Sequence, residues 1–345
     1  MRAIRAGELT EVAVVIVNYR TPDLAIRCID ALHGDKEVFP RLRVVLVDGG
    51  SADDSAAQLF DYVDQSRRDW ISFLPLETNG GFGWANNQAI LVLSGEPEPP
   101  EFIYLLNPDA EVTGGAVAAL VDELRDFPGC GAVGSQLLAS DGCKSASAFR
   151  FPSPGRELIG AAQSEKLGKM LGINSTVVSS NSSCEVDWVT GASVMFRAEA
   201  LRQSGLFDDG FFLYFEEVEL MHRLREHGWK IRYAPESRVS HIEGASTGIG
   251  ATATERPHPR YWYDSRRRYF GLTGGRSAVI AANLSLLAGK GLRALKAVFR
   301  RSPTQACRTK DVFRYGFVPS SADVVPSFPA WGDQPGRPPA WMDRT

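Results

Sequence analysis

The stretch Tyr104-Leu105-Leu106-Asn107-Pro108-Asp109 predicts a buried strand that ends abruptly in a carboxylate. Residues 102–106 form a short apolar run, typical of a strand covered on both faces in a parallel sheet. Proline fixes its own φ and keeps Asn107 out of helical geometry, so the chain turns there. We therefore expect Asp109 at the carboxyl edge of a sheet, where open α/β folds bind ligands and where a carboxylate can bind a hard divalent cation. Asn-Pro-Asp is also a turn signal without any chemistry.

Strands and helices alternate around this stretch. Apolar runs at Val12–Val17, Val44–Val47 and Ile71–Leu76 each precede a segment that predicts a helix. Four helices are expected. One begins at Thr21-Pro22, one begins near Asp54, one ends near Leu93, and one spans about Gly114–Phe127. This alternation predicts an α/β fold, a right-handed, mostly parallel sheet flanked by helices.

The second half of the chain is mixed. Val186–Arg197 predicts a strand, Val218–His227 a helix, and Trp229–Tyr233 and Arg238–His241 two short strands. Two stretches with weak periodicity, Ser147–Pro154 and Ala161–Ser183, are expected to be a mobile insertion. Gly244–Thr254 is rich in small and polar residues and predicts a flexible loop.

Composition excludes several classes of protein. The 345 residues are 44% hydrophobic and 23% charged with a formal net charge of -3, which is ordinary for a globular protein and gives no support for a nucleic-acid partner. Five scattered cysteines without a Cys-x-x-Cys pair suggest neither a disulfide framework nor a zinc site. Residues 1–11 lack the apolar core of a signal peptide, so we expect a cytoplasmic protein that is not secreted. The sequence does not indicate an oligomeric state.

The C-terminal region predicts a helical appendage. Ala278–Ala288 is apolar but too short to span a bilayer, and five basic residues follow it, namely Lys290, Arg293, Lys296, Arg300 and Arg301. This pattern predicts either an amphipathic helix on an anionic membrane surface or a helix packed on the protein with a solvated basic face. We expect residues 302–345 to be a poorly ordered, proline-rich tail without catalytic content.

Candidate ligand-binding residues recur where strands end. Val17-Asn18-Tyr19-Arg20 closes the first strand, and Asp48 closes the second, where a carboxylate can accept a hydrogen bond from a base imide or a ribose hydroxyl. Asn79-Gly80-Gly81-Phe82-Gly83 opens a helix after the third, where glycines permit close backbone approach and a helix N-terminus favours phosphate. Asn86 stands where a dinucleotide fingerprint needs a third glycine, so this is not that motif.

Two further positions have both a chemical and a structural interpretation. Glu217, next to Glu216 and behind an aromatic run, is a candidate general base with a raised pKa, or simply an acidic residue favoured at a helix N-terminus. His241 ends a short strand as a structural residue or a metal ligand. The Arg266–Arg268 run could bind phosphate or form a solvated helix face.

Together these segments resemble glycosyltransferase family 2, the inverting GT-A enzymes, and most closely its bacterial rhamnosyltransferase-like branch. The similarity extends from about Val12 to Phe270. Besides the pieces already quoted, it rests on Asp187-Trp188-Val189-Thr190-Gly191-Ala192 and on Phe211-Phe212-Leu213-Tyr214-Phe215-Glu216-Glu217-Val218-Glu219. No single piece is specific, but the set in this order and spacing is.

The resemblance implies a GT-A, Rossmann-like fold and a role for each matching position. Residues 1–242 would be the catalytic domain, 243–275 a loop and basic helix that close the site, 276–301 the amphipathic helix, and 302–345 the tail. The donor nucleotide-sugar would contact Val17, Tyr19, Asp48, Asn79, Gly80, Gly81, Phe82, Gly83, Asn86, Asn87 and Asn107. Trp188, Gly191 and Ala192 would shape the acceptor side, Asp109 and His241 would bind Mg²⁺ or Mn²⁺, and Glu217 would be the catalytic base.

The chain departs from the family pattern at two positions. Asn107 begins the metal motif in place of Asp, a change that also resembles the rhamnosyltransferase-like branch, and Glu217 stands where Asp is usual, so Glu216 remains a rival base. The resemblance implies transfer of a sugar to a hydroxyl of a glycan or lipid-linked glycan. Rhamnose from a dTDP or UDP carrier is the leading candidate for the donor. If the C-terminal helix binds the membrane, transfer would take place at its inner face. A catalytically decayed nucleotide-sugar or glycan-binding module and a sugar nucleotidyltransferase are the alternatives.

Overall fold

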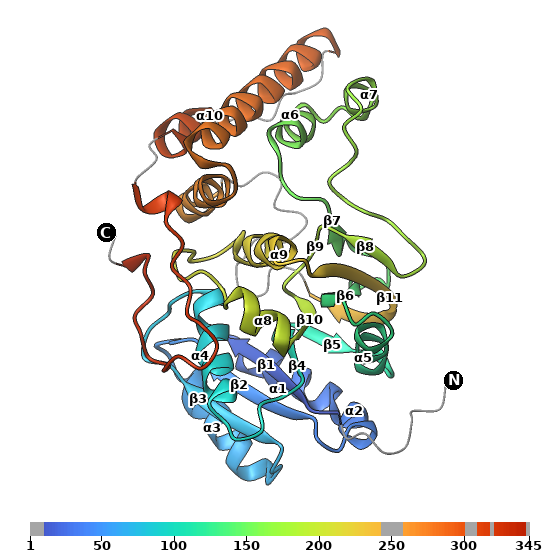
Figure 1. Ribbon diagram of the computed structural model, residues 1–345, viewed down its shortest axis with the longest axis vertical. Coiled ribbons are helices and arrows are strands. Elements are labelled where there is room, and N and C mark those ends of the chain that lie inside the picture. Colours follow the sequence, from blue (N-terminus) through green and yellow to red (C-terminus); the bar gives the residue numbers. More distant parts are fainter. Residues whose placement is uncertain (1–9, 243–257, 301–308, 318–320, 343–345) are drawn as a thin grey trace.

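A computed structural model describes residues 10–242, 258–300, 309–317 and 321–342 (Figure 1). The first half alternates strands and helices, as the sequence predicts. The elements in chain order are β1 (Val12–Asn18), α1 (Pro22–Ala31), α2 (His33–Val38), β2 (Arg43–Asp48), α3 (Ser55–Ser66), β3 (Ile71–Pro75), α4 (Phe82–Ser94), β4 (Phe102–Leu106), β5 (Ala110–Val112), α5 (Ala116–Asp126) and β6 (Cys130–Leu138).

The second half adds short strands and helices to this core. They are β7 (Ala148–Phe149), α6 (Pro154–Ala162), α7 (Glu165–Met170), β8 (Cys184–Val186), β9 (Trp188–Val189), β10 (Ser193–Arg197), α8 (Ala198–Ser204), α9 (Glu216–Glu226), β11 (Lys230–His241), α10 (Arg260–Arg300), α11 (Thr309–Asp311) and the helical turns η1 (Val312–Gly316) and η2 (Ser321–Val324).

The central sheet has the strand order β3-β2-β1-β4-β10-β6-β11-β5, with β8 paired to β11. Strands β3, β2, β1 and β4 are parallel, as are β6 and β11, whereas β10 runs antiparallel between β4 and β6. The expected mostly parallel α/β architecture is therefore confirmed. The carboxyl ends of β1, β2 and β4 meet at one edge, which positions the candidate site.

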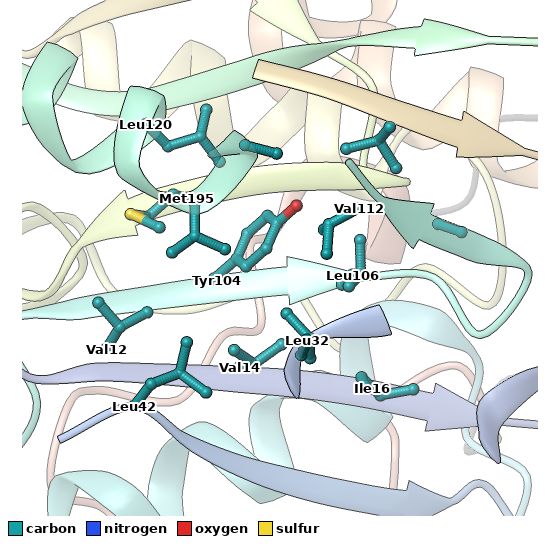
Figure 2. Packing of buried hydrophobic residues seen from close by; sticks show 14 of the residues in the cluster. Val12, Val14, Ile16, Leu32, Leu42, Tyr104, Leu106, Val112, Leu120 and Met195 are labelled. Atoms are coloured by element: carbon teal, nitrogen blue, oxygen red, sulfur yellow. The ribbon is translucent and has the colours of Figure 1, made fainter. Parts of the chain in front are cut away.

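Two hydrophobic clusters cover the two faces of the sheet. Val12, Val14 and Ile16 of β1 point into one cluster with α1, α3 and α5, while Ala13 and Val15 point into the other with α4, α8 and α9. Figure 2 shows the first cluster, with Tyr104 of β4 at its centre. Successive side chains of a strand point to opposite faces, so an uninterrupted apolar strand such as β1 must be covered on both.

The segment from 184 to 197 corrects the expectation of one strand. It forms β8, β9 and β10, and β9 leaves the main sheet to pair with β7. Asp187 causes the first break, because its carboxylate forms an ion pair with Arg225 and accepts a hydrogen bond from the Phe151 backbone N–H. The turn at 190–192 causes the second.

Other boundaries also differ from the sequence expectation. The two short strands expected near 229–241 are one strand, β11, with a register irregularity between Ala234 and Arg238 that contains Pro235, where a ladder donor is missing. The two stretches expected to be a mobile insertion contain β7 and α7, and α6 lies between them. Ser153 and Ser164 cap α6 and α7 by accepting bonds from backbone N–H groups.

The tail also differs from expectation in its described part. The η2 turn packs on α10, and residues 327–341 pack on α4 and on the segment that follows α8 through directional hydrogen bonds, including Trp84 Nε1–H to Arg337 O at 2.8 Å. A poorly ordered tail is therefore wrong for these residues. Helix α10 is interrupted by non-helical Gly274 and Gly275 and packs on α6. The predicted loop at Gly244–Thr254 lies outside the described residues.

Candidate active site

The turn after β4 brings Asp109 and His241 together. Ala110 of β5 pairs with His241 at the end of β11, and the Ile242 backbone N–H donates to Asp109 O at 3.1 Å. Asp109 Oδ1 lies 3.2 Å from His241 Nε2, and both side chains are largely buried. The two positions that the resemblance assigns to a metal are therefore neighbours.

The donor set around Asp109 fits a divalent ion. Both ring nitrogens of His241 are buried. Among the described residues Nδ1 has no hydrogen-bond partner, and Nε2 meets only the Asp109 carboxylate, 3.2 Å away, without hydrogen-bond geometry. A buried polar atom without a partner is costly, so a ligand at this point would satisfy it. A carboxylate and an imidazole are suitable ligands for Mn²⁺, and Mg²⁺ would depend more on Asp109. Two protein ligands leave coordination positions open for phosphate oxygens and water. The described residues contain no group of three or more His, Cys, Asp or Glu side chains that could hold a metal without such help.

Glu216 and Glu217 begin α9 after a strained turn. Tyr214 and Phe215 have φ angles of 70° and 69°, in the left-handed region that bulky residues rarely adopt. Such strain persists where the surroundings impose it and is common at functional sites. The turn places the two carboxyl groups at the N-terminus of the helix, where its dipole favours negative charge.

The two glutamates differ in environment. Glu216 is 3% exposed and lies against Gly83, while Glu217 keeps part of its surface exposed. Burial and the charge of Glu217 raise the pKa of Glu216 well above its ordinary value. Burial also raises the pKa of Glu217, but the backbone N–H groups of Glu217, Gly191 and Val218 oppose this shift. Glu216 is thus the carboxyl that retains the proton, and Glu217 is the one that ionises first.

The turn between β9 and β10 joins these two groups of residues. Asn107, the first residue after β4, donates its backbone N–H to Ala192 O at 2.9 Å. A Cβ on Gly191 would lie 3.1 Å from the Phe82 ring and 3.8 Å from Glu217 Cβ, so this glycine touches both the glycine-rich loop and the glutamate. Residues predicted from four distant segments therefore meet beside the end of β4.

The ends of β1 and β2 form a hydrogen-bonded pair of turns. Asp48 is 2% exposed, and its Oδ1 accepts bonds from Asn18 Nδ2 at 2.9 Å and Ser51 Oγ at 2.6 Å. Its Oδ2 accepts the Ser51 backbone N–H. Asp48 thus shapes the turn as well as offering lone pairs to a ligand. Val17 and Tyr19 beside it are partly exposed.

Ser51 is the residue at these turns that the sequence analysis did not assign. Its hydroxyl also accepts the Arg20 backbone N–H at 3.0 Å, so one side chain fixes both strand ends. The only sequence signal was its position directly after Gly49-Gly50.

The glycines of 79–83 are required by packing. A Cβ on Gly80 would lie 2.2 Å from the Trp84 ring, and one on Gly81, whose φ is +91°, would lie 1.8 Å from Phe212 O. Asn79 Oδ1 accepts the Gly81 backbone N–H at 3.1 Å and tightens the turn. The glycine pattern predicts close approach to a ligand, whereas in the structure these glycines are needed for close approach to Trp84 and Phe212 of the protein itself.

Asn87 corrects one predicted ligand contact. It is fully buried, donates to Phe207 O and Asp209 Oδ1, and accepts the Phe207 backbone N–H. It therefore ties α4 to the 207–209 turn and does not line a cleft. Asn86 is also buried and donates to Phe82 O at 2.9 Å, one helical turn earlier.

The acceptor-side prediction concerns Trp188, which is half-buried. Its ring stacks on Phe149 with centroids 4.2 Å apart, and its Nε1–H donates to Arg150 O. Trp188 is thus held as a rigid aromatic surface one residue before Val189, which is fully buried.

The Arg266–Arg268 run is neither a phosphate grip nor a solvated face. Arg266 and Arg268 are 2% and 1% exposed. Arg266 binds Glu157 and Asn283, Arg267 binds Asp323, and Arg268 binds Asp208 at 2.7 Å. These arginines hold α10 to the body of the protein, which corrects both interpretations from the sequence.

Comparison with known sequences supports the assignment along most of the chain. The family model "Glycosyl transferase family 2" matches residues 13–168, and "Glycosyl transferase family group 2" matches residues 168–293. The N-acetylglucosaminyl-diphospho-decaprenol L-rhamnosyltransferase of Mycobacterium tuberculosis is 31% identical over 217 residues, covering 59% of this chain and 68% of that protein. Rhamnosyltransferase WbbL of Escherichia coli is 28% identical over 172 residues, covering 47% of this chain and 60% of that protein.

Solved structures share the fold at low sequence identity. GalNAc-T7, solved with UDP, GalNAc and Mn²⁺, has a TM-score of 0.54 at 14% identity, covering 90% of this chain and 59% of that one. The mannosyltransferase PcManGT of Pyrobaculum calidifontis, solved with GDP-Man and Mn²⁺, has a TM-score of 0.50 at 14% identity, covering 88% and 84%. These neighbours establish the GT-A-like architecture alone.

Three findings indicate the same family. They are the residues at the strand ends, the two family models, and a relative that this chain matches over 68% of its length. The chain therefore belongs to glycosyltransferase family 2, as a rhamnosyltransferase-like glycosyltransferase.

Proposed function

We propose that this glycosyltransferase moves L-rhamnose, with inversion, from a dTDP or UDP carrier to a hydroxyl of a lipid-linked glycan. One chain of contacts supports the proposal most. Asn107, two residues before the Asp109–His241 pair begins, bonds to Ala192, and the adjacent Gly191 contacts Glu217. The names of the two curated relatives support rhamnose, and the decaprenol in one of them supports a lipid-linked acceptor.

The donor nucleotide would lie across the ends of β1 and β2. Val17 and Tyr19 offer partly exposed surface for a base, and Asp48 offers carboxylate lone pairs to an imide N–H or a ribose hydroxyl. The diphosphate would extend toward Asn107 and the N-terminus of α4. Asp109 and His241 would hold Mg²⁺ or Mn²⁺, which when bound neutralises the departing diphosphate as a Lewis acid.

Glu217 is the proposed general base. Glu216 keeps a proton because it is more deeply buried and faces the charge of its neighbour, so Glu217 is free to accept one. Glu217 takes the proton of the acceptor hydroxyl, whose oxygen forms a bond to the anomeric carbon. The bond from that carbon to the phosphate oxygen breaks, and its electron pair leaves with the diphosphate. Attack opposite the leaving group inverts the configuration, as in inverting glycosidases.

The acceptor would bind on the other side of Gly191, against Trp188 and the Ala192 turn. An aromatic face held in place by stacking suits contact with the apolar face of a sugar ring.

Helix α10 is the proposed contact with the membrane that carries this acceptor. Ile280, Leu284, Leu292 and Leu295 are spaced by four, eight and three residues, so they share one helix face, and they are between 38% and 56% exposed. Arg276, Lys290 and Arg293 lie near them in the sequence, whereas Lys296 donates to Ala162 O on the α6 side. A face of exposed leucines with basic neighbours suits the surface of an anionic bilayer.

The helix lies on the membrane in this proposal. By length and composition alone α10 could cross a bilayer. However, Gly274 and Gly275 break it, and its opposite face is committed to α6, against which a Cβ on Gly289 would clash. The protein would then work at the cytoplasmic face of the membrane.

A thermal-shift panel of nucleotide sugars with and without Mn²⁺, followed by a transfer assay, tests this function. We expect dTDP-rhamnose or UDP-rhamnose with Mn²⁺ to stabilise the protein selectively, because a ligand that binds only the folded state raises its melting temperature. The stabilising donor should then be consumed with a polyprenyl-diphosphate-linked N-acetylglucosamine acceptor. Nucleotide binding without turnover on any such acceptor would favour a decayed binding module, and release of pyrophosphate from a sugar phosphate and a nucleoside triphosphate would favour a nucleotidyltransferase.

A further inference from the structure

The C-terminal tail crosses the surface next to the proposed donor site. In Figure 1 the dark red segment runs beside α8 and α4. Pro329 O accepts the Leu206 backbone N–H at 3.0 Å, and Ser327 O accepts that of Asp209 at 2.7 Å. Further along, the Gly336 N–H donates to Gln88 Oε1 at 2.6 Å. The tail has no regular structure here, so these contacts define its path.

Trp341 ends this path on two loops at once. Its indole Nε1–H donates to Gly80 O at 2.9 Å, and its ring meets Phe212 edge-on with centroids 4.9 Å apart. Its backbone N–H donates to Asp209 O at 3.3 Å. Gly80 is thereby held between Trp341 and the ring of Trp84.

The two loops that Trp341 bridges carry the proposed chemistry. One is the 79–83 loop, and the other leads from Phe212 through the strained turn to Glu216 and Glu217. They touch directly, because Phe82 N–H donates to Phe212 O at 3.3 Å and Gly81 has no room for a side chain there. Glycines have the greatest conformational freedom of all residues, so this loop depends on outside contacts to keep one shape.

We propose that Trp341 is a positioning residue that holds the 79–83 loop and the Phe212 segment in the geometry that binds the donor. The inference rests on the proposed function, because it assumes that this loop lines the donor site. When the binding-competent state of a loop is only partly populated, the apparent affinity falls by that fraction. Loss of Trp341 should therefore weaken donor binding more than it slows the bound complex.

The experiment compares three variants of the full-length chain. Trp341→Ala removes both contacts, and Trp341→Phe keeps a ring against Phe212 but removes the donor to Gly80 O. Trp331→Ala is the matched control, because Trp331 lies on the same tail but packs on Arg202 at 5.3 Å, away from the loop. The probes are dTDP and UDP with Mn²⁺, measured by calorimetry, and the donor KM and kcat with the sugar nucleotide that the wild type consumes.

We expect Trp341→Ala to raise the Kd of the nucleotide that binds and the donor KM on the order of tenfold, with a smaller change in kcat. Trp341→Phe should fall between this variant and the wild type, and Trp331→Ala should match the wild type. Unchanged or tighter nucleotide binding in a folded Trp341→Ala protein would overturn the inference, as would an equal loss in Trp331→Ala. If the wild type binds neither nucleotide, the proposed function fails, and this inference fails with it.

Discussion

The adjacent residues Glu216 and Glu217 differ in burial and therefore in how readily they lose a proton. Burial against Gly83 and the charge of Glu217 raise the pKa of Glu216 well above its ordinary value, whereas backbone N–H groups oppose the rise that burial causes in the pKa of the half-buried Glu217, so we expect Glu217 to ionise first. Because glutamine resembles a protonated carboxyl group, we expect Glu216→Gln to keep most of the wild-type rate. Glu217→Gln should lower kcat by about two to four orders of magnitude, as loss of a general base does. Initial rates with saturating donor measure both, and an inactive Glu216→Gln beside an active Glu217→Gln would reverse the assignment.

Asp209 gives a prediction about stability and pH. Burial raises the pKa of this carboxyl to about 7, with Asn87 opposing the shift. The folded state therefore holds a proton that the unfolded state loses above its ordinary pKa of 3.8, so this group makes the protein less stable as the pH rises from about 4 to about 7. Asp209→Asn keeps the shape and removes the titration. Denaturant melts at several pH values in this range give the free energy of unfolding of each protein. The difference, variant minus wild type, should increase with pH, and a difference that does not change with pH would contradict the raised pKa of Asp209.

How much of the site the sequence predicts depends on the kind of signal. Asp48, Asp109 and the 79–83 loop were found because each follows an apolar run. The family resemblance alone predicts that His241 lies beside Asp109. No sequence pattern near either residue indicates that β5 pairs with β11. Ser51 and Trp341 have no role that the sequence predicts, and Asn87 was predicted to contact the donor but instead binds Phe207 and Asp209, because these partners lie far away in the sequence or are backbone atoms.

At the scale of elements, the parallel half of the sheet was predictable and the rest was not. Strand β6 has no long apolar run. Gly131 and Gly134 leave room for Trp229 and Val189, and Ser135 joins a buried hydroxyl chain with Ser193 and Ser237. Such a strand depends on its neighbours and shows no run of its own. The sequence around Arg266, Arg267 and Arg268 does not show that they are buried, because their distant acidic partners Glu157, Asp323 and Asp208 lie 56 to 109 positions away.

Helix α10 carries the prediction at this scale. Replacing Leu284 and Leu292 with glutamate should weaken binding to phosphatidylglycerol vesicles on the order of tenfold per leucine. Each substitution removes apolar surface that the membrane would bury and adds a negative charge that the anionic lipid repels. Flotation at low and high salt measures the effect, and the basic flank predicts weaker binding at high salt. Phe60→Glu is the control, because Phe60 of α3 is 57% exposed on another element. Equal flotation of the wild type and the leucine variant would reject the membrane face.

Across the protein, a buried ion pair joins α10 and the tail to the segment before α9. Arg268 binds Asp208, and both side chains are at most 1% exposed, while Asp208 Oδ2 also accepts the Ser327 backbone N–H of the tail. Removing one member of such a pair leaves an uncompensated charge and costs about 3–5 kcal/mol. We expect Arg268→Met to lose stability of this order in denaturant melts. Arg260→Met is the control, because Arg260 is 73% exposed in its ion pair with Asp264, and its loss should change stability little. Equal losses of stability in both variants would show that burial of the ion pair does not determine the cost of breaking it.

The central claim is that Asp109 and His241 hold a divalent ion against the diphosphate of a sugar donor beside Glu217. The most direct measurement is donor binding and turnover by the wild type and Asp109→Ala, each with Mn²⁺ and with a chelator. We predict that the chelator weakens nucleotide binding and stops transfer in the wild type, and that Asp109→Ala loses the metal-dependent part of binding together with transfer. Wild-type turnover in Asp109→Ala, unaffected by the chelator, would contradict the account.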